Sequence, residues 1–414
     1  MKRKKRFILL GVIGMSLLAA CGEKTEQALT GQTQAEEVDF NWVSEQTEYE
    51  GFTQEEIAEK AVGWEALFSG YDNALQDTYE NFRLPVAVTI SPTAIYKQVE
   101  IAQESDFAEN AEEILQMFWG DELSETLEFS DYSETMRQTT WVIDSEEEKV
   151  YCAVKDCGLV SVIKPSGYEI GFNGNFEVVD IVHVDRGDPL SQSYALTDGE
   201  ESIEEAVAYI EGWMNQNWVV WEPDFTYSVK TVEIRRYGDS YIYDFYVEKL
   251  LGGVPLDDAF GETGMAVEHG NLQVKYIGST IFIRMCTRNS IDVFSNQTGI
   301  LRVQSAEAEE KGWLSLSDCT HMLEQLFSEY VVYEISDIEM QYVLCPDYGS
   351  VNKELQYCGY VAPGLKILAK PVWCFVMDVP EEKLLNEDGS FTAGYEKHYI
   401  DVDMRTGEVW LELE

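Results

Sequence analysis

Residues 231–247 read TVEIRRYGDSYIYDFYV, and this stretch decides the class of fold that the sequence predicts. Apolar or aromatic residues alternate with polar ones on both sides of Gly238-Asp239, which is typical of two antiparallel strands joined by a two-residue turn. Such a turn fixes the register, and one face of the hairpin is then mostly apolar, as expected of a sheet that packs under a helix. The pairs expected on that face are Arg236 with Tyr241, Ile234 with Tyr243, and Val232 with Phe245.

The opposite face of this hairpin pairs Glu233 with Asp244. Like charges directly across a ladder destabilise a sheet unless something compensates them. Three alternatives are open: both carboxylates are solvated, Arg235 bridges them, or they bind a cation. Solvation is the default expectation.

The surroundings of the hairpin recur further along the chain. Ser202 begins a predicted helix that runs to about Trp218, and Glu205 completes its capping box. A second helix is expected to begin after Ser317 and to end near Tyr330. Each helix is followed by Ile-Asp-Val and then Thr-Gly, expected as a strand and a hairpin turn. We therefore predict two repeats, the alternative being chance similarity of two turns. Repeat 1 is 196–308, with Ile291-Asp292-Val293 and Thr298-Gly299, and repeat 2 is 312–414, with Ile400-Asp401-Val402 and Thr406-Gly407.

The two repeats carry a packing prediction. Each helix has one apolar stripe and each sheet one apolar face, so each should cover the other. Ile210 and Trp213 should point into the first sheet. Leu323, Leu326 and Phe327 should point into the second.

Two short motifs inside the repeats resemble those of a known family. One is Leu251-Gly252-Gly253-Val254-Pro255-Leu256, and the other is Lys370-Pro371-Val372-Trp373. Together with the helix, the hairpin and the Thr-Gly ending, they make residues 196–414 resemble tandem PepSY-like modules of bacterial envelope proteins. This resemblance implies non-catalytic modules that inhibit or regulate a partner.

The segment 49–190 is expected to form an N-terminal α+β domain. Thr53 to Leu75 begins with a capping box and predicts a helix, and the apolar spacing of Ala108 to Trp119 predicts another. Leu84 to Ile90 predicts a strand, and 139–164 predicts three antiparallel strands. The predicted fold class is α+β: an N-terminal α+β domain followed by two helix-on-antiparallel-sheet repeats.

The first residues are typical of an export signal. Met1 to Arg6 contain five basic residues, and the uncharged stretch Phe7 to Ala20 follows. Leu18-Ala19-Ala20-Cys21 resembles the bacterial lipobox, which implies cleavage before Cys21 and a diacylglycerol on its thiol. We therefore predict a lipoprotein signal peptide (1–20), an acidic flexible tether (21–48) and a lipid-anchored protein on the extracytoplasmic face of the cell membrane. An ordinary cleaved signal and an uncleaved helix are the alternatives.

The charge of the chain limits its partners. Its 76 aspartates and glutamates exceed its 29 lysines and arginines, so the formal net charge is −47. A phosphate backbone would be repelled, which excludes nucleic acid. The expected partners are the lipid bilayer, through the diacylglycerol of Cys21, and another envelope protein or peptide.

The sequence contains no recognisable catalytic or metal-binding motif. Ser161 and Lys164 have the Ser-x-x-Lys spacing of penicillin-recognising serine enzymes, but their segment predicts a strand where that motif needs a helix. No catalytic residue, cofactor or metal ligand is therefore predicted. Four histidines lack the spacing of zinc ligands: His183, His269, His321 and His398.

The cysteines and tryptophans are interpreted as core residues. Apart from Cys21, the cysteines show no Cys-x-x-Cys pair and are expected to be mostly reduced and buried. Trp213, Trp218 and Trp221 are expected in the core, the alternative being a stacking platform for a sugar or peptide.

These patterns favour a protein that acts by binding, in a regulatory, receptor-like or scaffolding role, and not an enzyme. Two alternatives from other classes stay open. One is an envelope hydrolase without a recognisable motif, which requires a cleft with a nucleophile and a base. The other is the solute-binding lipoprotein of a transporter, which requires parallel sheets in two lobes.

Overall fold

A computed structural model gives the fold of this chain, and all the residues that it describes lie within 49–414. The predicted signal peptide, Cys21 and the tether lie outside the described residues. These are 60–63, 82–84, 96–103, 106–119, 129–133, 138–144, 149–164, 177–256, 265–268, 271–274, 280–296, 298–308, 311–326, 333–347, 366–380, 384–385, 391–392 and 395–413.

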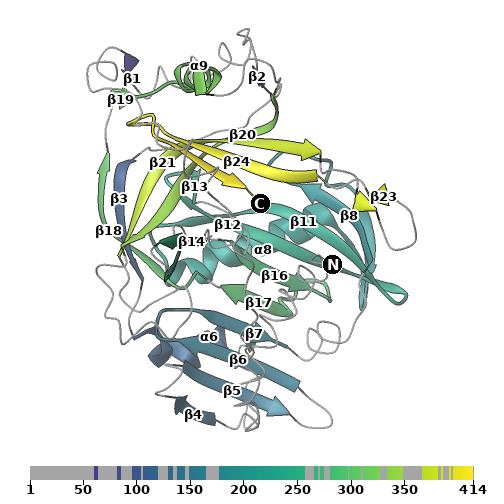
Figure 1. Ribbon diagram of the computed structural model, residues 1–414. Helices are drawn as coiled ribbons and strands as arrows, with labels where there is room; N and C mark the ends of the chain where they lie inside the picture. Colours follow the sequence, from purple (N-terminus) through teal and green to yellow (C-terminus); the bar gives the residue numbers. More distant parts are fainter. Residues whose placement is uncertain are drawn as a thin grey trace. The chain divides into compact units, whose positions relative to one another are not determined.

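The larger of two main sheets has ten strands, and all its neighbours pair antiparallel (Figure 1). The three strands expected within 139–164 are confirmed as β5, β6 and β7. In spatial order the strands are β4 (Phe129–Ser133), β5 (Gln138–Asp144), β6 (Lys149–Lys155), β7 (Val160–Ile163), β17 (Val293–Asn296), β16 (Ile281–Met285), β12 (Ser240–Leu251), β11 (Thr226–Tyr237) and β8 (Glu177–His183), with β13 (Val254–Pro255) beside the end of β12.

The second main sheet has seven strands. Only the short β2 pairs parallel within it, alongside β20, among the described strands. The path runs β18 (Leu301–Ala308), β3 (Tyr96–Gln103), β21 (Lys366–Pro380), β20 (Tyr333–Asp347) and β2 (Phe82–Arg83), while β24 (Tyr395–Asp403) pairs with β21 and with β25 (Val409–Leu413).

Four two-stranded ladders complete the described strands. Together with the helices below, the two main sheets confirm the α+β class. The ladders are β1 (Val62–Gly63) with β19 (Lys311–Trp313), β9 (Ser193–Leu196) with β10 (Gly199–Ser202), β14 (Met265–Glu268) with β15 (Asn271–Val274), and β22 (Leu384–Leu385) with β23 (Phe391–Thr392).

The register predicted for the β11–β12 hairpin is confirmed, including the pairing of Glu233 with Asp244. Gly238 has φ +58°, a conformation that a two-residue hairpin turn requires. The apolar face continues across the sheet because each cross-strand neighbour is also apolar. One such row is Val182, Val232, Phe245, Ile283, Phe294, Val162 and Cys152, all of them buried.

Two helices cover this apolar face. The capping box of Ser202 and Glu205 is confirmed at the start of α8 (Ile203–Gln216). The other helix, α6 (Ala111–Trp119), follows the 3₁₀ turn η3 (Phe107–Asn110) and confirms the helix expected there. Both meet at Phe294, whose ring centroid lies 5.0 Å from that of Phe118 and 6.1 Å from that of Trp213.

The tryptophans belong to the same core. Trp218, in the 3₁₀ turn η5 (Trp218–Val220), is fully buried with its ring centroid 4.5 Å from that of Phe294. Trp213 and Trp221 are partly buried against the core. The core interpretation is therefore confirmed for these three residues.

Two helix predictions need correction. The helix expected from Thr53 to Leu75 cannot be continuous, since Val62–Gly63 form β1 and pair with β19. Gly63 disfavours a helix, since a glycine inside a helix costs about 1 kcal/mol of stability relative to alanine. At this position the chain pairs with β19 instead. The helix expected after Ser317 is α9 (Leu316–Leu326), and it begins earlier because the Ser315 hydroxyl accepts a hydrogen bond from the Asp318 N–H at 3.1 Å. Leu323 is buried as expected, whereas the side chain of Leu326 and the whole of Phe327 lie outside the described residues.

The two Thr-Gly turns occupy different positions. Thr406-Gly407 joins β24 to its neighbour β25, as a hairpin turn does. Thr298-Gly299 instead leads from β17 in the larger sheet to β18 in the second sheet, so the hairpin expected there is wrong. The pairing of β18 with β3 replaces the local pairing with β17.

The predicted segments share sheets. Strands β4 to β7 of segment 49–190 lie in the larger sheet with strands of segment 196–308, and β3 lies in the second sheet with strands of segment 312–414. Two parts of the chain nevertheless follow the same plan, in which a helix precedes four strands and each strand pairs with the next of the four. The first is α8–β11–β12–β16–β17, and the second is α9–β20–β21–β24–β25. The segment boundaries and the two-repeat arrangement stay predictions.

Most of the described cysteines are buried. Burial raises the pKa of the Cys152 thiol to about 12. At neutral pH this thiol is protonated and behaves as a small hydrophobic side chain. The buried ones are Cys152, Cys157, Cys286, Cys319 and Cys374, while Cys345 is half-buried.

Candidate functional site

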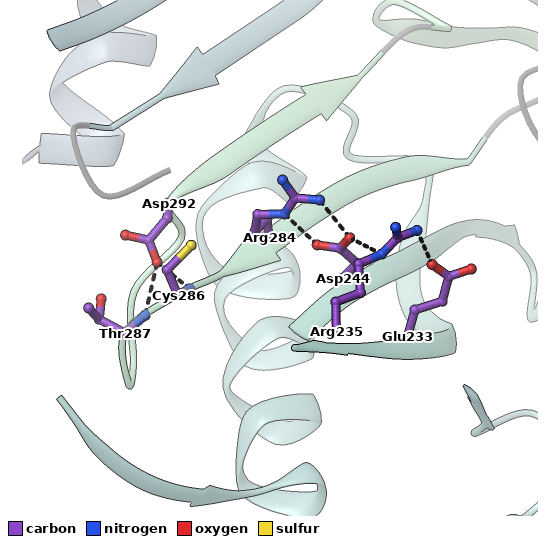
Figure 2. A network of polar contacts seen from close by, with 7 residues as sticks. All are labelled: Glu233, Arg235, Asp244, Arg284, Cys286, Thr287 and Asp292. Carbon is purple, nitrogen blue, oxygen red and sulfur yellow. Dashed lines mark hydrogen bonds and ion pairs between the residues drawn. The ribbon is translucent and has the colours of Figure 1, made fainter. Parts of the chain in front are cut away.

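A row of charged side chains crosses the larger sheet on the face opposite α8 (Figure 2). Asp244 on β12 lies directly between Glu233 on β11 and Arg284 on β16 in the register. The Arg284 guanidinium donates from Nε to Asp244 Oδ1 at 2.6 Å and from its terminal nitrogen to Oδ2 at 2.7 Å. Arg235 approaches the same Oδ2 with its Nε at 2.9 Å and also donates to Glu233. Two arginines and two carboxylates thus neutralise one another.

This row decides between the three alternatives left open for the facing acids. Asp244 is fully buried, so solvation is wrong for this carboxylate, and Arg235 bridges it to Glu233. Arg284 supplies a second bridge that the local sequence pattern did not predict. Burial acts to lower the pKa of Arg284, but the charge and hydrogen bonds of Asp244 outweigh it and raise the pKa.

Asp292 extends the polar contacts at the end of β16. Its Oδ2 accepts hydrogen bonds from the backbone N–H of Cys286 at 2.7 Å and of Thr287 at 3.2 Å. These bonds close the turn between β16 and β17, in which Asn289 has φ +53°. The aspartate of the Ile-Asp-Val motif therefore stabilises a turn.

A second charged cluster is buried on the opposite face of the same sheet. Glu222 and Lys249 are fully buried, and Lys249 Nζ donates to Glu222 Oε1 at 2.8 Å and to the Gly299 carbonyl at 3.1 Å. Burial lowers the pKa of Lys249, and the charge of Glu222 opposes that shift. Glu222 also accepts hydrogen bonds from Leu301 N–H at 2.9 Å, Trp218 Nε1 at 3.0 Å and the Tyr227 hydroxyl at 2.7 Å.

This second cluster fixes the crossing between the two sheets. Gly299 belongs to the Thr-Gly turn, and Leu301 is the first residue of β18. The Asn296 side chain also donates to the Gly299 carbonyl, at 3.0 Å. The Glu222–Lys249 pair therefore holds the chain where it leaves β17 for the second sheet.

The polar residues singled out from the sequence do not converge. Ser161 pairs with Ser295 in the interior of the larger sheet, which confirms the strand expected for the Ser-x-x-Lys segment. His183 ends β8, His321 lies in α9, and His398 lies in β24. Within the described ranges, no group of three or more histidine, cysteine, aspartate or glutamate residues could hold a metal ion. No described helix is long and apolar enough to cross a membrane.

A buried carboxylate precedes α8 and carries a prediction. Glu201 is buried, and its Oε2 has no hydrogen-bond partner. Burial and the charge of Glu205 raise the pKa of Glu201 above its ordinary 4.5, so the folded protein binds this proton more tightly than the unfolded chain. Protonated Glu201 therefore favours the folded state at low pH. This contribution to the free energy of unfolding is lost as the pH rises from about 4.5 through the pKa of Glu201 in the folded protein.

Glu201→Gln should therefore raise the free energy of unfolding at pH 7, by about 1 kcal/mol or less, because the neutral amide avoids the cost of burying a charge. The gain should vanish near pH 4, where both states of the wild type are protonated. Urea titrations at several pH values measure it, with Glu200→Gln at an exposed neighbour as the control. Equal effects of the two substitutions would contradict the prediction.

No protein-family model matches the chain, and no curated protein matches it. Among solved structures, the chain is similar to an uncharacterized protein from Eubacterium rectale, with 14% sequence identity and a TM-score of 0.48. The similarity covers 83% of this chain and 98% of that one.

Proposed function

We propose that this protein is a lipid-anchored extracytoplasmic protein that acts by binding another envelope protein or peptide, in a regulatory, receptor-like or scaffolding role. The observation that carries the binding role is the use of the buried charges. The carboxylates of Asp244 and Glu222 are bonded by Arg284, Arg235 and Lys249. These groups hold strands together, so they do not serve as a nucleophile or base.

The two alternatives find less support in the described residues. A hydrolase requires a cleft with a nucleophile and a base, whereas the two buried charge clusters join strands of the larger sheet and hold the crossing to the second sheet. A transporter's solute-binding protein needs parallel sheets in two lobes. The described sheets are antiparallel apart from the β2–β20 pair and the isolated bridge between Leu256 and Tyr342.

The proposal includes PepSY-like repeats as its architecture. The two series that begin with α8 and α9 support a duplication by their matching order of strands, whereas the different positions of the two Thr-Gly turns count against it. The first strands of the two series also contact each other, since Lys230 of β11 donates to Glu339 of β20 at 2.9 Å. Lys230 lies at a bulge in β11, which directs its side chain toward that strand.

The anchoring part of the proposal rests on Leu18-Ala19-Ala20-Cys21. Cys21→Ala should release the protein into the medium or leave it unprocessed, because no thiol remains for the diacylglycerol. Membrane fractionation of intact cells and the mass of the mature chain measure this result, with Cys286→Ala as a control that leaves the N-terminus unchanged. Tight membrane retention of fully processed Cys21→Ala protein would refute the anchor.

A further inference from the structure

A glycine precedes each of the helices α8 and α9 at the same spacing. Gly199 stands three residues before Ser202, and the hydroxyl of this serine accepts a hydrogen bond from the first turn of α8. Gly312 stands three residues before Ser315, whose hydroxyl does the same for α9. Each glycine also lies in a two-stranded ladder outside the main sheets, β9–β10 for the first and β1–β19 for the second. The two helices therefore begin in the same way.

An arginine guanidinium packs on each of these glycines. A Cβ atom on Gly199 would lie 2.8 Å from Cζ of Arg288. A Cβ atom on Gly312 would lie 2.5 Å from a terminal nitrogen of Arg405. Both glycines also have positive φ, +153° and +97°, which other residues rarely adopt. Glycine therefore lets each arginine approach the backbone closely, and we call the two contacts the arginine latches.

Each guanidinium also bonds the backbone at its glycine. The Arg288 guanidinium donates to the Asp198 carbonyl at 3.3 Å, and its Nε lies 3.5 Å from Oδ2 of the same residue. The Arg405 guanidinium donates to the Gly312 carbonyl at 3.0 Å and lies over the Trp313 ring, 5.2 Å from its centroid. Hydrogen bonds from a charged donor are stronger than those between neutral groups. Each arginine therefore ties the segment before a helix to the turn that carries the arginine.

The two arginines occupy the same place in their series. Arg288 lies in the turn after β16, and Arg405 lies in the turn after β24. These strands are the third of their series, and each pairs with the second and the fourth. After each arginine the turn contains a residue with positive φ, Asn289 at +53° and Gly407 at +71°. Both latches therefore join a helix start to the turn between the third and fourth strands.

This placement changes which turns correspond in the two series. Thr406-Gly407 comes directly after Arg405, so its counterpart in the first series is the turn that follows Arg288. Thr298-Gly299 comes later, after β17, where the chain crosses to the second sheet. When the arginines are matched, the different positions of the two Thr-Gly pairs no longer count against a duplication.

We propose that Arg288 and Arg405 are equivalent latches of a duplicated module, each holding the start of its helix on the turn between the third and fourth strands. The inference rests on the repeat architecture within the proposed function, and not on the lipid anchor or the binding role. It makes each latch a local conformational device. Release of one arginine loosens the helix start of its own module and leaves the other module closed.

One backbone hydrogen bond beside each latch reports whether it is closed. Thr197 N–H donates to the Cys286 carbonyl at 3.2 Å in the first series. Leu314 N–H donates to the Met404 carbonyl at 2.8 Å in the second. The first bond lies before its glycine and the second lies after it, so the arginine contact is the feature that the two series share. Each of these amide protons exchanges with solvent when its bond opens.

The first test is hydrogen exchange of the purified chain, followed by mass spectrometry of peptides that contain Thr197 or Leu314. Arg288→Ala should speed exchange at Thr197 by about ten-fold, because a charge-assisted hydrogen bond and an ion pair are lost there. Exchange at Leu314 should not change. Arg405→Ala should have the reverse effect. Arg236→Ala removes an exposed arginine of β11 that lies in neither turn, so this matched control should change neither reporter.

The second test separates the arginine contact from backbone strain. Gly199→Ala should speed exchange at Thr197 by displacing Arg288. In the Arg288→Ala chain the same glycine substitution should add much less, because no guanidinium remains to be displaced. Gly187→Ala is the matched control, since Gly187 also has positive φ, +76°, but a Cβ there would meet nothing within 4 Å. The same cycle at Gly312 tests the second latch.

Three results would overturn the inference. Unchanged exchange in both arginine variants would show that these contacts hold nothing closed. An effect in only one series would show that the device is not repeated and would remove the equivalence. Faster exchange at both reporters in either variant would show a general loosening of the fold. The binding role has its own test, a crosslinking pull-down of the anchored protein from intact cells: recovery of no partner would refute that role and leave the latches standing.

Discussion

Lys249→Met should lower the free energy of unfolding by about 3–5 kcal/mol, because it leaves the carboxylate of Glu222 charged and buried without a cation. The loss of the Lys249 charge should also weaken the other hydrogen bonds that Glu222 accepts. Glu222 also holds Leu301 at the start of β18, so its reorientation would loosen the passage between the two sheets. Urea unfolding at neutral pH measures the change.

A double-mutant cycle of Glu222→Gln and Lys249→Met, made singly and together, measures the interaction free energy of this pair. Glu222→Gln combined with Lys249→Met removes both charges and keeps an acceptor for the neighbouring donors, so it should cost less than Lys249→Met alone. Lys60→Met is the matched control, since Lys60 makes an exposed ion pair with Asp318 at 3.1 Å, and its effect should be about 1 kcal/mol or less. A cost for Lys249→Met as small as that of the control would show that the buried pair is not needed for stability.

The sequence contains a signal for the buried Glu222–Lys249 cluster. The register set by the Gly238-Asp239 turn places residues 241, 243, 245, 247 and 249 on one face of β12. Four of them are apolar or aromatic, and the fifth is Lys249. A lysine on a buried face requires an acidic partner nearby. What the register does not identify is Glu222, because its position depends on how the chain turns after α8.

The features that were predicted correctly depend on short stretches of chain. The capping box of Ser202 and Glu205, the helix that contains α6, and the β11–β12 register each follow from residues within one helix or hairpin. Local hydrogen bonds and side-chain period decide them. These local features are therefore found in the structure largely as predicted.

The features that were missed depend on pairing between distant segments. Residue 160 pairs with residue 296, and through this ladder β4 to β7 join the larger sheet. The Thr298-Gly299 turn looks like Thr406-Gly407 in sequence, but β18 finds its partner in β3. A local pattern does not show which distant strand will pair with a given strand. Two similar turns therefore end in different pairings, a hairpin in one case and a crossing to the other sheet in the other.

Arg284 shows the same limit at the candidate site. The hairpin alone presented Glu233 and Asp244 with Arg235 as their only basic neighbour. The second arginine arrives from β16, which β13, β14 and β15 separate from β12 in the sequence, and it makes the bidentate contact. An acid that looked solvated in a hairpin is therefore buried in the sheet.

Asp244→Asn should lower the free energy of unfolding by about 3–5 kcal/mol, because the buried Arg284 guanidinium then loses the carboxylate that accepts both of its hydrogen bonds. The side chain keeps its shape, so the loss reports the missing charge and not a cavity. Chemical unfolding measures it, with the melting temperature as a second readout. The register predicts a further result: Asp244→Leu combined with Arg284→Met should recover much of the loss, since an apolar pair suits a buried position.

Glu233→Gln is the matched control for this prediction. Glu233 is partly exposed and pairs with Arg235, so its neutralisation should cost about 1 kcal/mol or less. If Asp244→Asn costs no more than Glu233→Gln, the charged row does not hold β11, β12 and β16 together, and its buried carboxylate must have another role.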